Sequence, residues 1–189
     1  MKKIIVTAVL VFLSLTVLLG IIYPFLIWGL GHLFLRNQAE GSLVARDGKI
    51  VGSRLIAQPF AGSRYFHPRP SAIGYDAAAS GGSNLAPSNR SLINAVRSRI
   101  EEAKKGNPTP IPLDLVFSSA SGLDPDISVA AALWQAPRVA RARGIDETAL
   151  FAIINRHKEP PLLGFIGEPR VNVLLLNLYL DEYYDRGVK

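Results

Sequence analysis

The sequence predicts an α+β protein: one N-terminal transmembrane helix followed by a small mixed α/β domain with long loops rich in glycine, serine and proline. Three observations support this prediction. No charged side chain occurs from Ile4 to Gly31, helical and strand-like patterns alternate beyond it, and residues 58–89 have the composition of a loop. A chain of 189 residues, 49% of them apolar, suffices for one modest domain beside such a helix. We expect an anchor at residues 1–36 and one globular domain at residues 37–189.

The apolar run at the N-terminus is longer than the roughly 20 residues that cross the hydrocarbon core of a bilayer. Lys2 and Lys3 precede it, which is also how a cleaved signal peptide begins. However, the run exceeds the apolar region of a signal peptide, about 7–15 residues, and no small-x-small cleavage site follows it. We therefore expect an uncleaved transmembrane helix at about residues 4–31.

Several residues of this run suggest that the helix packs against protein as well as lipid. Gly20 permits close approach of another backbone, and Pro24 leaves a carbonyl that a neighbour or an adjusted turn must satisfy. Tyr23 suits the far membrane interface. Basic residues flank the run on both sides, so charge alone leaves the orientation of the helix open.

The chain after the anchor begins with a predicted β-hairpin. Leu43 and Val44, followed by residues 49–57, have strand-like composition around the dipeptide Asp47-Gly48. This dipeptide is typical of a two-residue hairpin turn. We therefore expect two short strands directly after the anchor.

Residues 58–89 form a predicted loop, and a loop of this length in a compact domain is usually disordered or functional. Its aromatic residues, Tyr75 among them, indicate an ordered contact surface. The stretch Ser80-Gly81-Gly82-Ser83-Asn84 can present backbone amide groups to an anion or carbonyl groups to a cation. A plain turn is the simpler alternative.

Four helices are predicted beyond this loop, because apolar residues recur at helical spacing and Ser, Asp or Asn stands at each expected cap of the first three. Gly144 is typical of a helix end. A short apolar stretch at residues 113–117 is predicted to be a buried strand. The predicted helices are residues 90–105 after a cap at Ser88 or Asn89, a helix from a cap at Asp126 or Ser128 to Arg143, a helix after a cap at Asp146, and residues 171–183.

The segment before the last helix has a distinct pattern. Gly164 and Gly167 frame a predicted tight turn, after which Pro169 is expected to begin the helix. Glu168 and Arg170 can pair with one another or face a partner. The segment is thus either a simple junction of loop and helix or part of an interface.

Two amide residues, Asn172 and Asn177, lie in the predicted last helix, which is otherwise strongly apolar. A buried amide needs hydrogen-bond partners. We therefore expect both side chains to tie this helix to the loops rich in small residues.

Motifs of covalent catalysis and of nucleotide hydrolysis are absent from the sequence. It contains no G-x-x-x-x-G-K-[ST], no G-x-S-x-G, no S-x-x-K and no H-E-x-x-H. It also contains no cysteine, which excludes disulfides, thiolate metal sites and cysteine nucleophiles. The chain by itself is therefore not expected to be an enzyme.

Metal binding and nucleic-acid binding are not predicted either. The three histidines are far apart in the sequence, and no carboxylate accompanies them at ligand spacing. Asp124 and Asp126 flank Pro125, a pattern that favours a loop entering a capped helix over a pair of catalytic acids. The net charge of +6 is spread along the chain instead of forming a basic patch.

Six groups of residues, in order along nearly the whole chain, carry a resemblance to one family. They are Leu15-Thr16 through Gly20 to Tyr23-Pro24; Arg69-Pro70-Ser71-Ala72 with Tyr75-Asp76; Ser80-Gly81-Gly82-Ser83-Asn84-Leu85 with Pro87-Ser88-Asn89; Ser121-Gly122-Leu123-Asp124-Pro125 with Ile127-Ser128; Gln135-Ala136-Pro137-Arg138-Val139-Ala140; and residues 164–177. Together they resemble the C subunit of the Kdp-type bacterial potassium-transporting P-type ATPase. Ala86 stands where that family often has glycine, and Asp126 where it often has histidine.

The resemblance implies an accessory subunit of a complex that hydrolyses ATP on another chain and transports potassium. The implied partners are a potassium-channel-like subunit, the P-type ATPase subunit, a very small membrane subunit and the lipid bilayer. It also implies the bacterial cytoplasmic membrane, with the N-terminus in the cytoplasm and the domain outside. No tightly bound cofactor is implied; ATP associates through the complex.

The family resemblance also implies a catalytic chaperone that raises the ATP affinity of the hydrolysing subunit, with a glutamine that Gln135 matches. ATP is bound on the cytoplasmic side, so we favour assembly and support of the potassium-entry side. The alternative is a membrane-tethered extracytoplasmic binding protein or hydrolase acting alone. The candidate partner-interface residues are Gly20, Tyr23, Pro24, Tyr75, Asp76, Ser80, Gly81, Gly82, Ser83, Asn84, Glu168, Arg170 and Asn172.

Overall fold

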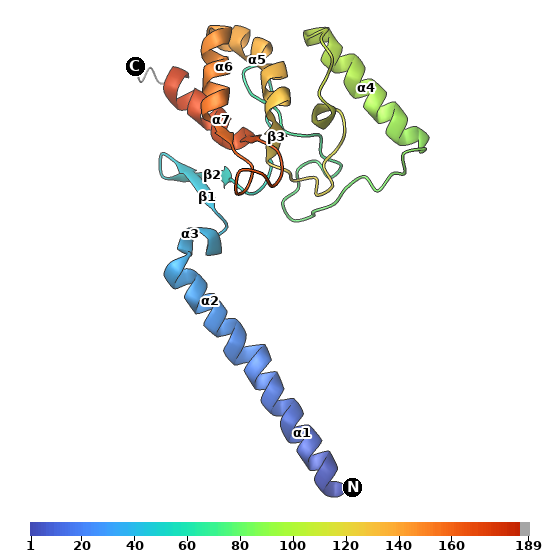
Figure 1. Cartoon of the computed structure of the whole chain (residues 1–189), viewed down its shortest axis with the longest axis vertical. Helices are drawn as coiled ribbons and strands as arrows, with labels where there is room; N and C mark the ends of the chain where they lie inside the picture. The colour runs from blue at the N-terminus through green and yellow to red at the C-terminus, as the bar shows by residue number, and fades with distance from the viewer. Residues whose placement is uncertain (186–189) are drawn as a thin grey trace. The chain divides into compact units, whose positions relative to one another are not determined.

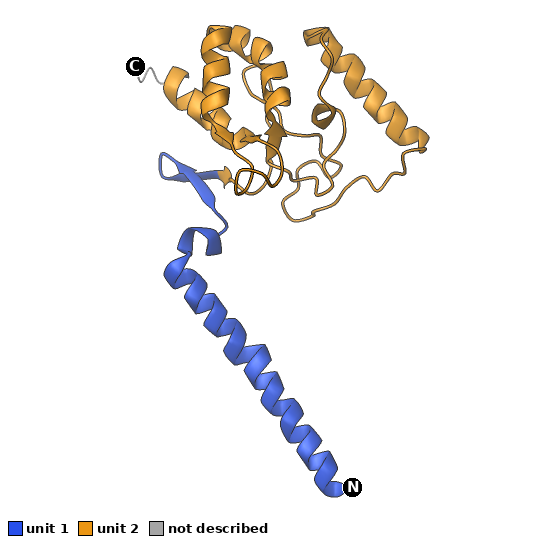
Figure 2. Ribbon diagram, viewed as in Figure 1, with its two compact units in different colours: residues 1–51 blue, residues 52–189 orange. Residues whose placement is uncertain are grey.

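The computed structural model describes residues 1–185 and has the predicted mixed α and β architecture with one long N-terminal apolar helix. The chain divides into two compact units, residues 1–51 and 52–189 (Figure 2). The elements in order are α1 Lys2–Val17, a π-helical turn Leu18–Ile22, α2 Tyr23–Phe34, α3 Arg36–Ala39, β1 Leu43–Arg46, β2 Lys49–Ser53, α4 Arg90–Gly106, a 3-10 turn Leu113–Leu115, β3 Asp126–Ser128, α5 Val129–Arg143, α6 Glu147–Arg156, β4 Lys158–Glu159, β5 Arg170–Asn172, α7 Val173–Leu180 and a π-helical turn Asp181–Asp185 (Figure 1).

The first unit is dominated by one apolar helix, Lys2–Phe34, whose 33 residues are long enough to cross a membrane. Its π-helical turn Leu18–Ile22 directly precedes the Tyr23-Pro24 pair. Because Pro24 has no N–H group, the carbonyl four residues earlier loses its helical donor. A wider turn at this point is a usual way for a helix to accommodate such a residue, and an adjusted turn was one of the two alternatives predicted from the sequence.

The hairpin predicted around Asp47-Gly48 is confirmed. β1 and β2 form a two-stranded sheet, and Asp47 and Gly48 connect them with φ values of 52° and 73°. Both central residues of the favoured two-residue hairpin turn have positive φ, which Asp and Gly adopt more readily than other residues. The two turn residues themselves therefore account for the position of the hairpin.

The core of the second unit lies among α5, α6 and α7, which are grouped together in Figure 1. Leu150, Ile154, Leu176 and Leu180 are completely buried there. Full burial of each such side chain stabilises the fold by about 1.5–3 kcal/mol. This apolar cluster fixes the three helices against one another.

The predicted helix caps are largely confirmed. Asn89 accepts a hydrogen bond from the Ser91 N–H group and begins α4. Ser128, the second of the two candidates for α5, accepts from Ala131 N at 3.0 Å. Gly144 ends α5 in the left-handed conformation, with φ of 68°, and Asp146 caps α6.

The start of the last helix was predicted wrongly. Residues 170–172 form β5, the central strand of a three-stranded antiparallel sheet in the order β3-β5-β4, and Pro169 precedes this strand instead of beginning a helix. Val171 pairs with Ile127 on one side and with Lys158 on the other. Asn172 then caps α7 by accepting from the Leu175 N–H group. Pairing between distant segments therefore overrides the local helical pattern.

The strand predicted at residues 113–117 is also wrong, since residues 113–115 form a 3-10 turn. The Asp114 carboxylate accepts a hydrogen bond from the Ser128 backbone N–H at 2.7 Å. The N–H groups of Leu115 and Val116 donate to carbonyls three residues earlier. A tight turn lets this segment satisfy its own backbone groups while Asp114 supports the entry to α5.

Helix α4 has no buried residue and stands apart from the α5–α7 group in Figure 1. The Arg99 guanidinium donates to the Val116 carbonyl at 2.9 Å and ties the helix to the turn region. Its predicted apolar face, Leu92, Val96 and Ile100, is half-buried. The space between α4 and α5 contains the cavity described below.

Candidate functional site

The segment Gly62–His67 is held by side chains of α5 and α7. Every carbonyl oxygen of the segment accepts a hydrogen bond from one of four side chains. Arg138 donates to the carbonyl oxygens of Gly62, Ser63 and Tyr65, with N···O distances of 3.3, 2.9 and 3.0 Å. The other three carbonyl oxygens accept from Arg143 at Arg64 (2.7 Å), from Asn177 at Phe66 (2.9 Å) and from Gln135 at His67 (3.0 Å). Phe66 is buried whereas Gly62, Ser63 and Arg64 are exposed. The bonds to Phe66 therefore satisfy a buried backbone, and those at the other end of the segment hold a surface turn in place.

Two amide side chains hold two consecutive residues in the same way. Gln135 Oε1 accepts from His67 N at 2.9 Å while its Nε2 donates to the His67 carbonyl. Asn177 Oδ1 accepts from Phe66 N at 2.8 Å while its Nδ2 donates to the Phe66 carbonyl. Successive residues of an extended chain point to opposite sides, so α5 holds one residue and α7 the next. We call this pair of interactions the amide clamp.

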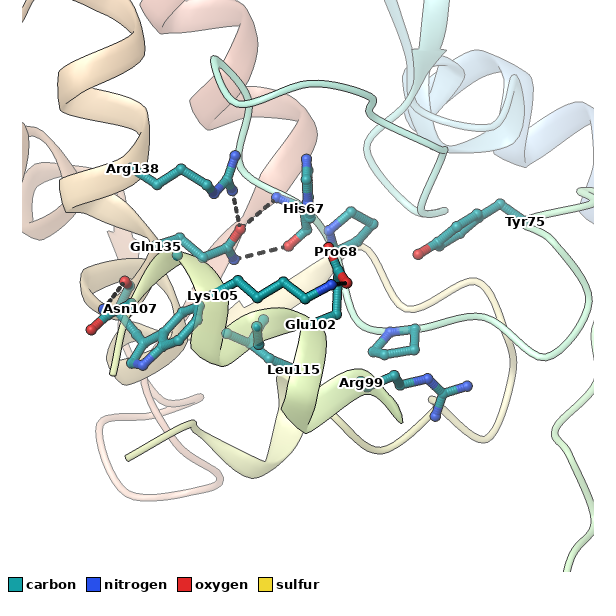
Figure 3. Close-up of a pocket in the computed structure, with 14 residues that line it drawn as sticks. His67, Pro68, Tyr75, Arg99, Glu102, Lys105, Asn107, Leu115, Gln135 and Arg138 are labelled. Atoms are coloured by element: carbon teal, nitrogen blue, oxygen red, sulfur yellow. Dashed lines mark hydrogen bonds and ion pairs between the residues drawn. The ribbon is translucent and has the colours of Figure 1, made fainter. Parts of the chain in front are cut away.

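The amide clamp is buried, which makes its hydrogen bonds costly to break. Gln135 is 3% exposed, and Asn177 and Phe66 are 0% exposed. Arg138 also donates to Gln135 Oε1 at 2.9 Å, so that oxygen accepts two hydrogen bonds (Figure 3). Burial lowers the pKa of Arg138 from its ordinary value.

A buried ion pair supports the other end of the segment. Arg143 pairs with Asp181 at 2.7 Å, and their side chains are 0% and 13% exposed. The Arg143 guanidinium also lies 5.1 Å from the centre of the Tyr65 ring. Removal of either charge would leave the other buried without this partner, which is strongly destabilising. The pair therefore links α5 to the turn after α7.

A cavity of about 650 Å³ lies beside the amide clamp, between α5 and α4 (Figure 3). Arg99, Lys105 and Arg138 contribute positive charge to its lining, and Glu102 contributes negative charge. The aromatic side chains Tyr75 and Trp134 also line it, as do prolines and the clamp residues Gln135 and His67. An anion or a flat ring is the chemistry that such a lining could accept.

Two titratable groups of this cavity have shifted pKa values. The pKa of His67 lies below its ordinary value, first because the ring is buried and second because the Arg138 charge is close. The pKa of Tyr75 is raised, mainly by burial. His67 therefore favours the neutral form, in which its Nε2 lies 3.0 Å from the Gly62 carbonyl.

No group of three or more His, Asp or Glu side chains within residues 1–185 could hold a metal ion. Asp124 and Asp126, which were considered as a pair of catalytic acids, each form an ion pair within the fold. Asp124 pairs with Arg69 at 3.1 Å, and Asp126 pairs with Arg170 at 2.9 Å. Burial is the main reason that the pKa of Asp126 is raised, with Arg170 acting in the opposite direction.

The predicted site residues fall into separate places. Gln135 and Tyr75 line the cavity, whereas Gly20, Tyr23 and Pro24 belong to the long apolar helix. Asp76 accepts a hydrogen bond from the Ala78 N–H group within its own turn. These residues therefore belong to two different units of the chain.

The Ser80–Asn84 stretch packs against a neighbouring loop. Gly81 N donates to the Ser121 carbonyl at 2.8 Å, and the Ser80 hydroxyl lies 3.2 Å from the same oxygen. A Cβ atom on Gly82 would approach the Ala120 carbonyl oxygen to 2.8 Å, so the close contact requires glycine. Ser83 and Asn84 are exposed. The contact between loops favours the simple structural interpretation of this stretch.

The remaining candidates, Glu168, Arg170 and Asn172, lie at and beside β5. Asn172 Nδ2 donates to the Arg54 carbonyl at 2.9 Å and lies 3.2 Å from Asp126 Oδ1. The expectation that Asn177 ties the last helix to the loop of residues 58–89 is confirmed by its bonds to Phe66. Asn172 instead bonds to Arg54 and Asp126, which lie outside that loop.

The spacing of Gln135 and Arg138 on one helix was visible in the sequence, but nothing there identified Phe66 and His67 as their neighbours.

Comparison with known proteins decides the family. The family model described as K+-transporting ATPase, c chain, matches residues 5–182. The chain belongs to the KdpC family. It is 54% identical over 187 residues to the potassium-transporting ATPase KdpC subunit of Methylibium petroleiphilum, covering 96% of this chain and 98% of that protein. The resemblance recognised in the sequence is therefore confirmed.

Other relatives match to a similar extent. The KdpC subunit of Koribacter versatilis is 50% identical over 184 residues, which is 96% of this chain and 95% of that protein. The KdpC subunit of Rhodospirillum rubrum is 50% identical over 182 residues, which is 94% of both chains. As a KdpC chain, the protein is an accessory subunit of a potassium-transporting ATPase.

The amide clamp predicts a graded effect of substitutions at Gln135. Gln135→Leu removes both partners of the His67 backbone and should lower the free energy of unfolding by about 1–3 kcal/mol. Gln135→Glu keeps an acceptor for the His67 N–H and for Arg138 and loses only the donor to the His67 carbonyl, so it should cost less. Denaturant unfolding of the full chain in detergent, followed by tryptophan fluorescence, measures both, with exposed Asn94→Leu on α4 as the control. Equal midpoints for Gln135→Leu and the control would contradict a supporting role of the clamp.

The lowered pKa of His67 predicts that acid destabilises the domain. In the unfolded chain the ring titrates near pH 6.5, whereas the folded chain keeps it neutral to lower pH. As pH falls below about 6.5, the unfolded state binds the proton first, so the free energy of unfolding decreases. Unfolding curves at about pH 7.5 and about pH 5.5 should show a smaller decrease for His67→Gln than for the unsubstituted chain. The same decrease in both would show that other groups cause the effect.

Proposed function

We propose that this chain assembles and supports the potassium-entry side of an ATP-driven potassium uptake complex, and that it acts there as a chaperone that raises the ATP affinity of the hydrolysing chain. The observation that carries the proposal is the family match over residues 5–182, together with a single N-terminal helix long enough to cross a membrane. The partners would be the channel-like subunit, the P-type ATPase subunit and a very small membrane subunit.

The proposed location is the bacterial cytoplasmic membrane, with the N-terminus in the cytoplasm and residues 37–189 outside. The apolar helix would be the anchor. Gly20 lies within the π-helical turn Leu18–Ile22 and Pro24 follows it, so both are where the backbone geometry departs from a regular helix. Small residues and such irregular turns are used for contacts between membrane helices. This stretch is therefore our candidate for contact with the membrane-embedded partners.

An effect on ATP affinity would have to be indirect in this topology, because ATP is bound on the opposite side of the membrane. The geometry of Gln135 supports an indirect role. Its oxygen accepts two hydrogen bonds and its nitrogen donates one to His67, and the side chain is 3% exposed. A nucleotide that took over these hydrogen bonds would have to open the clamp. We propose that Gln135 supports the shape of the domain that faces the partners.

The cavity beside the clamp favours a second candidate function. Its volume of about 650 Å³ is within the range of small-molecule sites, about 300–1,000 Å³. Arg99, Lys105 and Trp134 could bind a phosphate-bearing or other anionic molecule. Binding of such a ligand would be a second function of the domain beside its role as a subunit. Ligand binding by the isolated chain, without the other chains of the complex, would distinguish this function from the subunit role.

The proposed orientation is testable by proteolysis. A protease added outside spheroplasts should digest the domain beyond Arg36, because an uncleaved anchor with a cytoplasmic N-terminus exposes that domain outside. Immunoblotting for a tag on the C-terminus measures the digestion, and a cytoplasmic protein in the same sample controls for leakage. A domain that is digested only after permeabilisation of the membrane would reverse the orientation.

The proposed accessory role predicts how ATPase activity responds to this chain. The purified chain alone should hydrolyse no ATP, and the complex purified without it should show a higher KM for ATP than the complete complex. Addition of the full chain should restore the KM, and Gln135→Glu should restore it better than Gln135→Leu. Hydrolysis by the isolated chain, or an unchanged KM in its absence, would contradict the proposal.

A further inference from the structure

The hairpin that connects β4 and β5 carries exposed apolar side chains at its tip. Residues 160–167, Pro-Pro-Leu-Leu-Gly-Phe-Ile-Gly, contain no charge. Four large side chains of this stretch form what we call the apolar tip. Their exposed fractions are 66% for Leu162, 76% for Leu163, 77% for Phe165 and 49% for Ile166. Neighbouring exposed apolar residues on a folded domain mark an interaction site more often than isolated ones do.

The backbone of the apolar tip is fixed by hydrogen bonds. Leu162 and Ile166 exchange two N–H to carbonyl bonds of 3.0 and 2.9 Å, and the Gly164 N–H donates to the Pro161 carbonyl at 2.9 Å. Leu163 has φ of 55°, a left-handed conformation that leucine rarely adopts. Such conformations occur where the surrounding structure enforces them, often at binding sites. The turn therefore presents its apolar side chains in a defined arrangement.

The base of the hairpin is attached to the core. Val171 in β5 is completely buried and lies between β3 and β4. Arg170 pairs with Asp126 at 2.9 Å and with Glu159 at 3.2 Å, which joins all three strands. A projection with such a base loses little conformational entropy on binding, and prior order of this kind favours affinity.

The charge beside the apolar tip indicates the kind of surface it fits. Glu168 is exposed, and its carboxylate pairs with none of the residues that the structure describes. A free anion next to the tip disfavours a membrane surface of anionic lipids. It favours a protein surface with a basic side chain at the corresponding position.

We propose that the apolar tip binds in an apolar socket, bordered by a basic side chain, on another protein chain of the potassium-transporting ATPase complex; this inference rests on the proposed subunit role. A groove with similar chemistry occurs in this chain itself. It is lined by Leu92, Ile93, Val96 and Phe117, with Arg97 at its edge. A second copy of the chain is therefore a competing occupant that the experiment must distinguish.

The absence of cysteine from the sequence allows a single reporter to be placed on the tip. Phe165→Cys, labelled with an environment-sensitive fluorophore, is incorporated as full chain into nanodiscs that contain anionic lipid, with and without the other chains of the complex. The emission should shift to shorter wavelength, and a soluble quencher should lose access, only in the assembled complex. A shift with lipid alone, or a shift in detergent that depends on the concentration of the labelled chain, would overturn the proposal.

Substitutions give an independent readout of the same contact. Phe165→Ser should weaken binding of the full chain to the rest of the complex by about tenfold or more, as expected for a central interface residue. Glu168→Lys should also weaken it, because it places a positive charge opposite the basic side chain of the socket. Leu113→Ser, at a site that is 72% exposed elsewhere in the domain, is the matched control. All three variants should unfold like the unsubstituted chain, because these side chains are exposed.

The outcomes separate this proposal from the subunit role itself. If the unsubstituted chain fails to bind the other chains, the proposed function is wrong. If the unsubstituted chain binds and Phe165→Ser and Glu168→Lys bind equally well, only the docking of the apolar tip is wrong. Equal loss in Leu113→Ser would also overturn it, because the effect would not be specific to the tip.

Discussion

The second unit depends on how the backbone of Gly62–His67 obtains its hydrogen bonds. Phe66 packs into the core with 0% exposure, so its chain segment must enter the protein interior. A buried peptide group without a partner costs about 1–3 kcal/mol, and both the N–H and the carbonyl of Phe66 are of this kind. Asn177 satisfies both groups from α7, while Gln135 and Arg138 on α5 hold the half-buried neighbours His67 and Tyr65. The long loop is thereby turned into part of the core without becoming a strand.

This arrangement couples elements that are distant in the sequence. Gln135 on α5 and Asn177 on α7 hold adjacent residues, so a displacement of either helix would disturb the same short segment. Side-chain hydrogen bonds of this kind require tightly defined positions, because the donors and acceptors are fixed on rigid helices. Arg143 and Asp181 add an ion pair between the same two regions. The cavity wall formed by His67 is consequently set by the packing of the helices.

The features that could be predicted from the sequence are those caused by residues that are close together in the chain. The Asp47-Gly48 turn and the apolar helix each follow from neighbouring residues and were predicted, and Ser128 was one of the two caps predicted for α5. β5 was mistaken for helix because its pairing with β3 joins residues more than forty positions apart. The partner of Gln135 is 68 positions away, and no periodic pattern reports such a contact. A polar residue in an apolar helix indicated that a partner exists but not which one.

The amide clamp and the apolar tip also differ in what they leave for other molecules. Inside, Gln135 and Asn177 have donors and acceptors engaged within the chain, so a partner that used them would first have to break buried bonds. Outside, Phe165 and Glu168 have no comparable engagement among the described residues, and the backbone that carries them is already fixed. Binding at the second place costs less reorganisation. A partner that binds at the apolar tip would therefore leave the clamp closed.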